Sequence, residues 1–182
     1  QFITTSFDLK NNATLRKPFG KKNGYQHLWL EAFGNSKQSQ GTYTWLTNNR
    51  FYSITTLAND STDFLFAEIG ANDPNFNLRN GPCFIVRQKG SDNYTFISAI
   101  EPHGEYNGKD EITIGSDSKI KEIKNVISDN EKTIAEISLV DGQLLTICIS
   151  NNNSDKKSSH NYKINDSIYQ WVGPYLIDIS DK

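Results

Sequence analysis

Two polar groupings in the sequence carry side chains that could do chemistry. The first is "IEPHGEY", residues 100–106, which follows the apolar run "YTFISAI" and contains Glu101, His103 and Glu105. Side chains two residues apart on an extended chain point the same way, so a carboxylate and an imidazole would meet here. Such a pair could bind sugar hydroxyls or act as acid and base, or it could only brace a turn. The residues alone leave both possibilities open.

The second grouping is the long connector inside "AEIGANDPNFNLRNGPCFIV", residues 67–86, which is lined with amides and charges. It contains Asn72, Asp73, Asn75, Asn77 and Arg79. An Asp-Pro step starts a turn, and Asn side chains cap backbone groups in long connections. The same amides and the guanidinium could instead form a polar rim that binds hydroxyls and carboxylates, because arginine captures carboxylates in a bidentate way.

Several kinds of site are not expected. The three histidines, His27, His103 and His160, are far apart and have no ligand neighbour at metal spacing, so we expect neither a metal nor a cofactor bound by this chain. No nucleophile-elbow, nucleotide-binding or zincin motif is present. Cys83 and Cys148 lie in apolar runs, which argues against thiol catalysis. They could form one disulfide or remain two buried thiols.

The composition points to one domain over residues 1–182. Hydrophobic residues make up 36% and aromatic residues 12%, and the net charge of −2 gives no basic surface for nucleic acid or for a membrane. No apolar run approaches the roughly 18 residues of a spanning helix. The chain starts at Gln1 and has no Met, so we expect a processed or excised chain that could have lost a signal peptide. We expect a periplasmic or extracellular location.

Apolar residues alternate with a period of two along most of the chain. The steps Asn48-Asn49, Asp141-Gly142 and Asn165-Asp166 separate such runs and predict hairpin turns. The pattern predicts an all-β fold, a two-layer antiparallel β-sandwich of about a dozen strands. The segment 117–129 is ambiguous, because its isoleucines at spacings of three and four would also suit a short helix.

Five stretches together resemble the C-terminal region of a known enzyme family. They are "GYQHLWLEAFG", "TYTWLTNNRFYSITT", "IGANDPNFNLR", "AIEPHG" and "YQWVGPY", in order and with natural spacing. The resemblance covers residues 1 to about 175 and is to alginate lyases of polysaccharide lyase family seventeen, in the heparinase II/III-like group.

The resemblance implies a β-sandwich region that partners an N-terminal (α/α) toroid, with the substrate cleft between them. Such enzymes cleave uronate polysaccharides such as alginate by β-elimination. The Asn, His and Tyr that move protons lie mainly on the toroid and the first part of the β region, and the structural Zn is expected upstream. This chain shows no long helical pattern, so we expect no catalytic residue in it and little or no activity alone, and whether to call it an enzyme stays open.

The resemblance carries a narrower set of residues onto this chain. Glu101 is expected at the cleft, where it would bond the sugar at the non-reducing end. His103, Asn75 and Arg79 are weaker candidates for the same substrate-binding wall. Tyr25 and His27 match family positions to which no role is assigned, and His27 shares a strand face with Trp29, which favours a buried, hydrogen-bonded histidine.

Two rival functions remain. The chain could be a stand-alone, non-catalytic carbohydrate-binding module. It could also belong to a lyase that acts on another uronate, such as heparan-type chains, because a sandwich alone scarcely sets the chemistry of a site.

Overall fold

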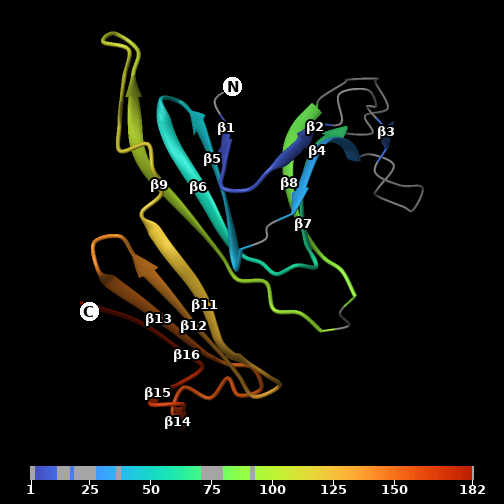
Figure 1. Cartoon of the computed structure of the whole chain (residues 1–182). Coiled ribbons are helices and arrows are strands. Elements are labelled where there is room, and N and C mark those ends of the chain that lie inside the picture. The colour runs from blue at the N-terminus through green and yellow to red at the C-terminus, as the bar shows by residue number, and fades with distance from the viewer. Residues whose placement is uncertain are drawn as a thin grey trace. The chain divides into compact units, whose positions relative to one another are not determined.

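The computed structural model describes residues 3–11, 17–18, 28–35, 38–70, 80–90 and 93–181. Within these ranges the chain forms β-strands joined by turns and bends, with no helix (Figure 1). The predicted all-β, antiparallel fold of the β-sandwich type is therefore confirmed. None of these residues belongs to a helix long and apolar enough to cross a membrane.

Sheet A contains the candidate motif "EPHG". Its strands, in spatial order, are β1 (Ile3–Thr5), β5 (Gln40–Thr47), β6 (Arg50–Leu57), β9 (Ser98–Asn107) and β10 (Ile112–Ile114). Strand β9 pairs antiparallel with β6 on one side and with β10 on the other.

Sheet B contains the two strands that flank the long connector in the sequence. It is formed by β2 (Leu9–Asn11), β4 (Leu28–Asn35), β7 (Thr62–Gly70) and β8 (Asn80–Gln88), in that order, with β3 (Lys17–Pro18) beside β4. Strands β7 and β8 pair antiparallel over their full length. The rings of Phe7 and Phe64 stack at 4.3 Å between centroids in the core of this sheet.

Sheets C and D come from the last third of the chain. Sheet C orders β11 (Ile120–Ser128), β12 (Lys132–Leu139), β13 (Gln143–Ser150) and β16 (Tyr175–Asp181). Sheet D is the hairpin of β14 (Ser159–Ile164) and β15 (Ser167–Val172). Their shared core is made of buried Ile134, Cys148, Tyr169 and Trp171.

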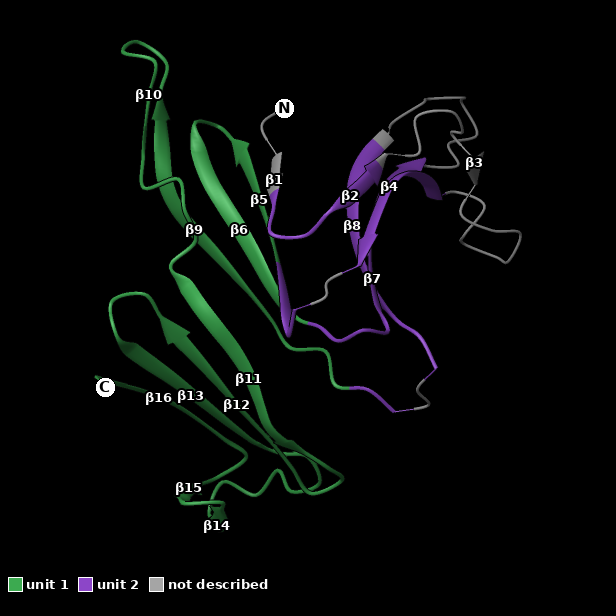
Figure 2. Ribbon diagram, viewed as in Figure 1, with its two compact units in different colours: residues 1–4, 42–57, 95–182 green, residues 5–41, 58–94 purple. Residues whose placement is uncertain are grey.

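The described chain groups into two compact units, which Figure 2 colours separately. One unit holds residues 1–4, 42–57 and 95–182, and so most of sheet A with sheets C and D. The other holds residues 5–41 and 58–94, and so sheet B. The expectation of a single domain over residues 1–182 stays a prediction.

The ambiguous segment 117–129 contains strand β11 and no helix. Its pairing with β12 shifts register between Ile120 and Glu122, and again between Asn125 and Ile127. A bulge adds one residue to a strand, so side chains three apart can lie on one face. Ile120 and Ile123 accordingly stand opposite two β12 residues that are two apart. The helix-like spacing is thus the signature of a bulged strand.

Candidate functional site

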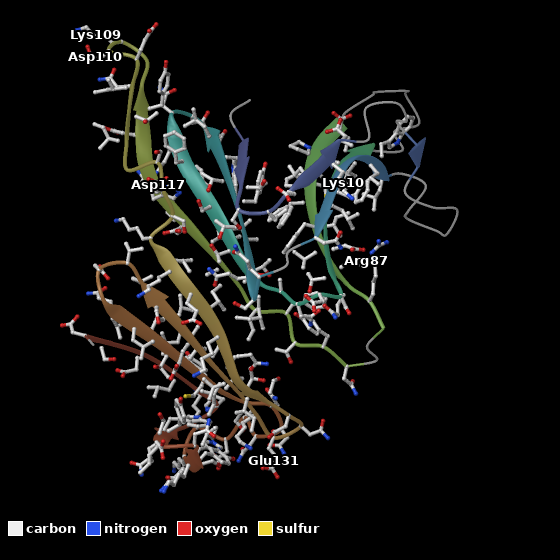
Figure 3. All side chains as sticks on the ribbon, viewed as in Figure 1. Lys10, Arg87, Lys109, Asp110, Asp117 and Glu131 are labelled. Carbon is white, nitrogen blue, oxygen red and sulfur yellow. The ribbon has the colours of Figure 1, made fainter. Side chains whose placement is uncertain are left out.

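The motif "EPHG" lies inside strand β9. Glu101 and His103 follow the apolar run "YTFISAI" in the sequence, but the strand does not end with that run and continues to Asn107. The reason is β10, which folds back through a tight turn and pairs Ile114 with Glu105 and Ile112 with Asn107. The tip of this hairpin carries Lys109 and Asp110 (Figure 3). The motif therefore lies in the middle of a sheet, and its side chains have fixed neighbours.

His103 is buried and bonded through both ring nitrogens. Its side chain is 3% exposed. Nδ1 lies 2.8 Å from the Gly115 carbonyl oxygen, and Nε2 lies 2.8 Å from the Ser53 hydroxyl. A carbonyl can only accept, so Nδ1 carries the proton, and in the neutral ring Nε2 accepts from Ser53. Ser53 is bonded in turn to Thr44 at 2.5 Å, and the imidazole stacks on Phe51.

Glu101 holds the chain that leads into β11. Its carboxylate accepts hydrogen bonds from the Ser118 hydroxyl and from the Lys119 backbone N–H, the latter at 3.1 Å to each oxygen. The residue is only partly buried. A carboxylate has about four acceptor positions, so two donors do not exhaust it. Glu101 is thus held in a defined orientation and can still accept a hydrogen bond from a ligand.

Gly104 allows two chain segments to touch. It has a φ of +33°, and a Cβ at this position would overlap the backbone of Gly115 and Ile114. The pairing of β6 with β9 skips Gly104, since Arg50 stands opposite Glu105 and Phe51 opposite His103. A bulge with glycine in it is a common way to bend a strand locally.

Three residues of the motif therefore contact one short segment, residues 115–119. Glu101, His103 and Gly104 bind or touch it through the carboxylate, the imidazole and the backbone. This arrangement can present an oriented carboxylate to a hydroxyl-bearing ligand. It does not leave the imidazole nitrogens of His103 open to exchange protons with one.

The other residues assigned to the substrate wall cannot be placed. Asn75 and Arg79 lie outside the described residues, as do Tyr25 and His27. Their expected roles stay predictions. Among the residues that are described, no group of three or more His, Cys, Asp and Glu side chains could hold a metal ion.

One charged cluster was not predicted from the sequence. Asp63 on β7 is 5% exposed and binds Arg87 at 2.5 Å, Lys89 at 2.8 Å and the Asn35 amide at 2.5 Å. Burial alone would raise the pKa of Asp63, but the hydrogen bonds from Lys89 and Arg87 outweigh burial and lower it. Figure 3 shows Arg87 on the ribbon of β8.

The signal for this cluster lies in the strand register. Once β7 and β8 are paired across their connector, Asp63 falls opposite Arg87. Opposite charges facing each other across two strands stabilise a sheet. Both residues are visible in the sequence, but only the pairing of β7 with β8 shows that they face each other.

Both cysteines are free thiols. Cys148 is 1% exposed and belongs to the core of sheets C and D, whereas Cys83 on β8 is only partly buried. Burial, helped by the carboxylates of Asp178 and Glu136, raises the pKa of Cys148 to about 11. Burial also raises the pKa of Cys83. Neither thiol is set up as a nucleophile at neutral pH.

The aromatic residues of sheet A form a row as well as a core. Tyr43 stacks on Trp45 with 5.2 Å between ring centroids, and Trp45 stacks on Tyr52 with 5.6 Å. All three side chains are partly buried, and burial raises the pKa of Tyr43. This row of rings is therefore only partly covered.

Comparison with known proteins gives the fold and the motif a context. No family model matches the chain. An exo-oligoalginate lyase from Saccharophagus degradans is 36% identical over 176 residues, and an alginate lyase from Stenotrophomonas maltophilia is 36% identical over 173 residues. Each alignment covers 95% of this chain but only 24% and 23% of the respective relative.

The chain is thus an all-β homologue of part of a lyase. More specifically, it is homologous to alginate lyases and spans about a quarter of the length of the two curated relatives. The resemblance seen in the sequence motifs is confirmed at this level.

Proposed function

We propose that this chain is the β-domain of an alginate or oligoalginate lyase, where it forms one wall of the substrate cleft. The observation that carries the proposal is the 36% identity over nearly the whole chain to two alginate lyases of which it spans only a quarter. The proposal includes membership of polysaccharide lyase family seventeen and an N-terminal (α/α) toroid as the partner domain. A periplasmic or extracellular location fits an enzyme that meets a polymer outside the cytoplasm.

We propose further that the chain alone has little or no lyase activity. β-Elimination needs a group that neutralises the C6 carboxylate, a base for the C5 proton and an acid for the leaving oxygen. His103 has both ring nitrogens bonded to the protein, and Cys148 is buried with a raised pKa. These groups suit positioning better than proton transfer, so the proton-moving groups are assigned to the rest of the enzyme.

In this proposal Glu101 binds the sugar at the non-reducing end. Its carboxylate accepts a hydrogen bond from a sugar hydroxyl, and the bonds from Ser118 and Lys119 keep it oriented before the sugar arrives. A side chain that is already held in place loses less entropy on binding. His103 contributes to the same wall by holding the segment that Glu101 also contacts. Asn75 and Arg79 would add an amide and a guanidinium, the latter suited to a uronate carboxylate.

A stand-alone carbohydrate-binding module is the second candidate. The partly covered row of Tyr43, Trp45 and Tyr52 favours it, because aromatic rings present large, rigid apolar surfaces that are also suited to contact with ligands. Both candidates predict binding of uronate oligosaccharides, and they differ in whether the chain works within a larger enzyme.

The test is a calorimetric titration of alginate oligosaccharides into the chain, with two variants. Glu101→Gln removes the charge that receives the sugar hydroxyl, and Ser118→Ala removes a bond that holds Glu101. We expect saturable binding that Glu101→Gln weakens about tenfold, the loss typical of one hydrogen bond to a charged group, while Ser118→Ala changes it much less. Absence of binding, or equal losses in the two variants, would remove Glu101 from the substrate wall.

A further inference from the structure

One face of sheet C is mainly apolar, most consistently on β13 and β16. The strand register places three rows of side chains on this face. The first row is Ile123, Ile137, Leu145 and Ile179; the second is Asn125, Ala135, Ile147 and Ile177; the third is Ser128, Thr133, Ile149 and Tyr175. We call this surface the apolar face of sheet C. The polar members, Asn125, Ser128 and Thr133, all lie on β11 and β12, whereas the six side chains on β13 and β16 are aliphatic or aromatic.

The burial of this face changes from one side of the sheet to the other. Ile123 and Ile137, on β11 and β12, are 1% and 5% exposed. Tyr175, Ile177 and Ile179, on β16, are 63%, 60% and 65% exposed. The apolar surface therefore continues beyond the part that is covered, out to the last strand of the sheet.

The sequence of β16 shows that this exposure is not incidental. The side chains that alternate with the isoleucines are Leu176, which packs on the core of sheets C and D, and the polar Asp178 and Ser180. A strand whose isoleucine side faced water would be expected to carry polar residues on that side. A contiguous apolar patch on an otherwise ordinary surface marks a site of contact with protein.

We infer that the β13–β16 half of this face is the docking surface for the polypeptide that the alginate lyase relatives carry outside the matched region. The inference rests on the proposed function. Roughly three quarters of each relative lies outside the alignment, so those enzymes contain a large segment that could cover this face. Isoleucine side chains offer no hydrogen bonds or charges to a polymer of hydroxyls and carboxylates, which argues against the substrate as the occupant. The occupant is an apolar surface of the same enzyme.

The experiment uses a chimera in which this chain replaces the matched region of the Stenotrophomonas maltophilia lyase, compared with the chain alone. The test variant is Ile177→Lys with Ile179→Lys. The matched control is Ile168→Lys with Val172→Lys, because these two side chains are each 63% exposed and lie on sheet D. Hydrogen exchange of residues 175–179 and the melting temperature are measured in both settings, and lyase activity in the chimera.

We expect the amides of residues 175–179 to exchange about tenfold more slowly in the chimera than in the chain alone. The test variant should lower the melting temperature of the chimera by several degrees and abolish this protection, while the control variant does neither. Equal exchange in the two settings, or equal effects of the two variants, would overturn the inference.

Two other occupants would show themselves in the chain alone. If it is a dimer that the test variant turns into a monomer, the face binds a second copy. If it is a monomer that the test variant destabilises more than the control does, the chain covers its own face. Either result overturns the inference. A protected chimera without lyase activity would instead count against the proposed function while leaving the docking surface in place.

Discussion

The imidazole of His103 donates a hydrogen bond to the Gly115 carbonyl oxygen at 2.8 Å, and this bond ties the middle of β9 to the segment that enters β11. Glu101 holds the same segment three residues further on, through Ser118. The motif "EPHG" is therefore a clamp between sheet A and the start of sheet C. A clamp of this kind fixes the carboxylate that we propose for sugar binding.

Removal of the imidazole should destabilise the fold. His103→Ala would remove the imidazole partner of the buried Ser53 hydroxyl and of the Gly115 carbonyl, and it would open a cavity beside Phe51. We expect a loss of about 2–4 kcal/mol in the free energy of unfolding, measured by urea denaturation. Glu105→Ala, at an exposed position on the same strand, is the control and should change little. Equal stability of the two variants would contradict the clamp.

The close contact between Gly104 and Gly115 gives a second prediction. Gly104→Ala combines a positive φ with an overlap against the Gly115 backbone, whereas Gly142→Ala has a positive φ of +96° but open space around the new Cβ. Both should destabilise by about 1 kcal/mol for the backbone conformation, and Gly104→Ala by clearly more. Thermal unfolding of the two variants measures the difference. A larger loss of stability in Gly142→Ala than in Gly104→Ala would contradict the close contact between Gly104 and Gly115.

Local chemistry made much of the fold predictable. Asn48 and Asn49 both adopt a positive φ, 50° and 61°, as a two-residue hairpin turn requires. Gly142 and Asn165 do the same in the two later hairpins, so all three predicted turns are confirmed. Turn residues act through their own backbone conformation, so a hairpin turn can be predicted from the identity of the residues in it.

The site was less predictable because its contacts depend on distant strands. Glu101 finds its partners 17 and 18 residues away, and His103 meets Ser53 across 50 residues. Strand β9 is extended because β10 pairs with its end, and no periodicity in "EPHGEY" predicts that pairing. The bulges of β11 likewise hid a strand behind a helix-like spacing.

Acid should weaken the fold through two hydrogen-bonded carboxylates. The Lys132 side chain, followed by the backbone N–H groups of Lys132 and Glu131, lowers the pKa of Asp129 to about 2. Because the folded pKa lies below the unfolded value of 3.8, the contribution of Asp129 to stability is present above that value and is lost as the pH falls toward about 2. Asp63 has the same direction.

We therefore expect Asp129→Asn to flatten the acid branch of the stability profile. The measurement is urea denaturation at a series of pH values from about 6 down to about 2, which spans the window in which the carboxylate titrates. Asp60→Asn, at an exposed turn position, serves as the comparison. If Asp129→Asn loses stability with falling pH as steeply as the wild type does, the hydrogen bonds to this carboxylate do not persist in solution.

The two thiols should react very differently. Cys148 is buried with a pKa of about 11, and Cys83 is partly exposed. A chromogenic disulfide reagent at neutral pH should modify Cys83 slowly in the folded protein and Cys148 only after unfolding. Cys83→Ser should remove the slow phase and leave the second. A denatured, unreduced sample that shows no thiol would instead mean that the two cysteines pair.

The central claim is that this chain supplies one wall of an alginate lyase and not its proton-moving groups. The most direct test is to mix the pure chain with polymannuronate and follow the ultraviolet absorbance of the unsaturated product, with the full-length Stenotrophomonas maltophilia lyase as the positive control. We expect no rise in absorbance with the chain and a clear rise with the control. Clear turnover by the chain alone would contradict it.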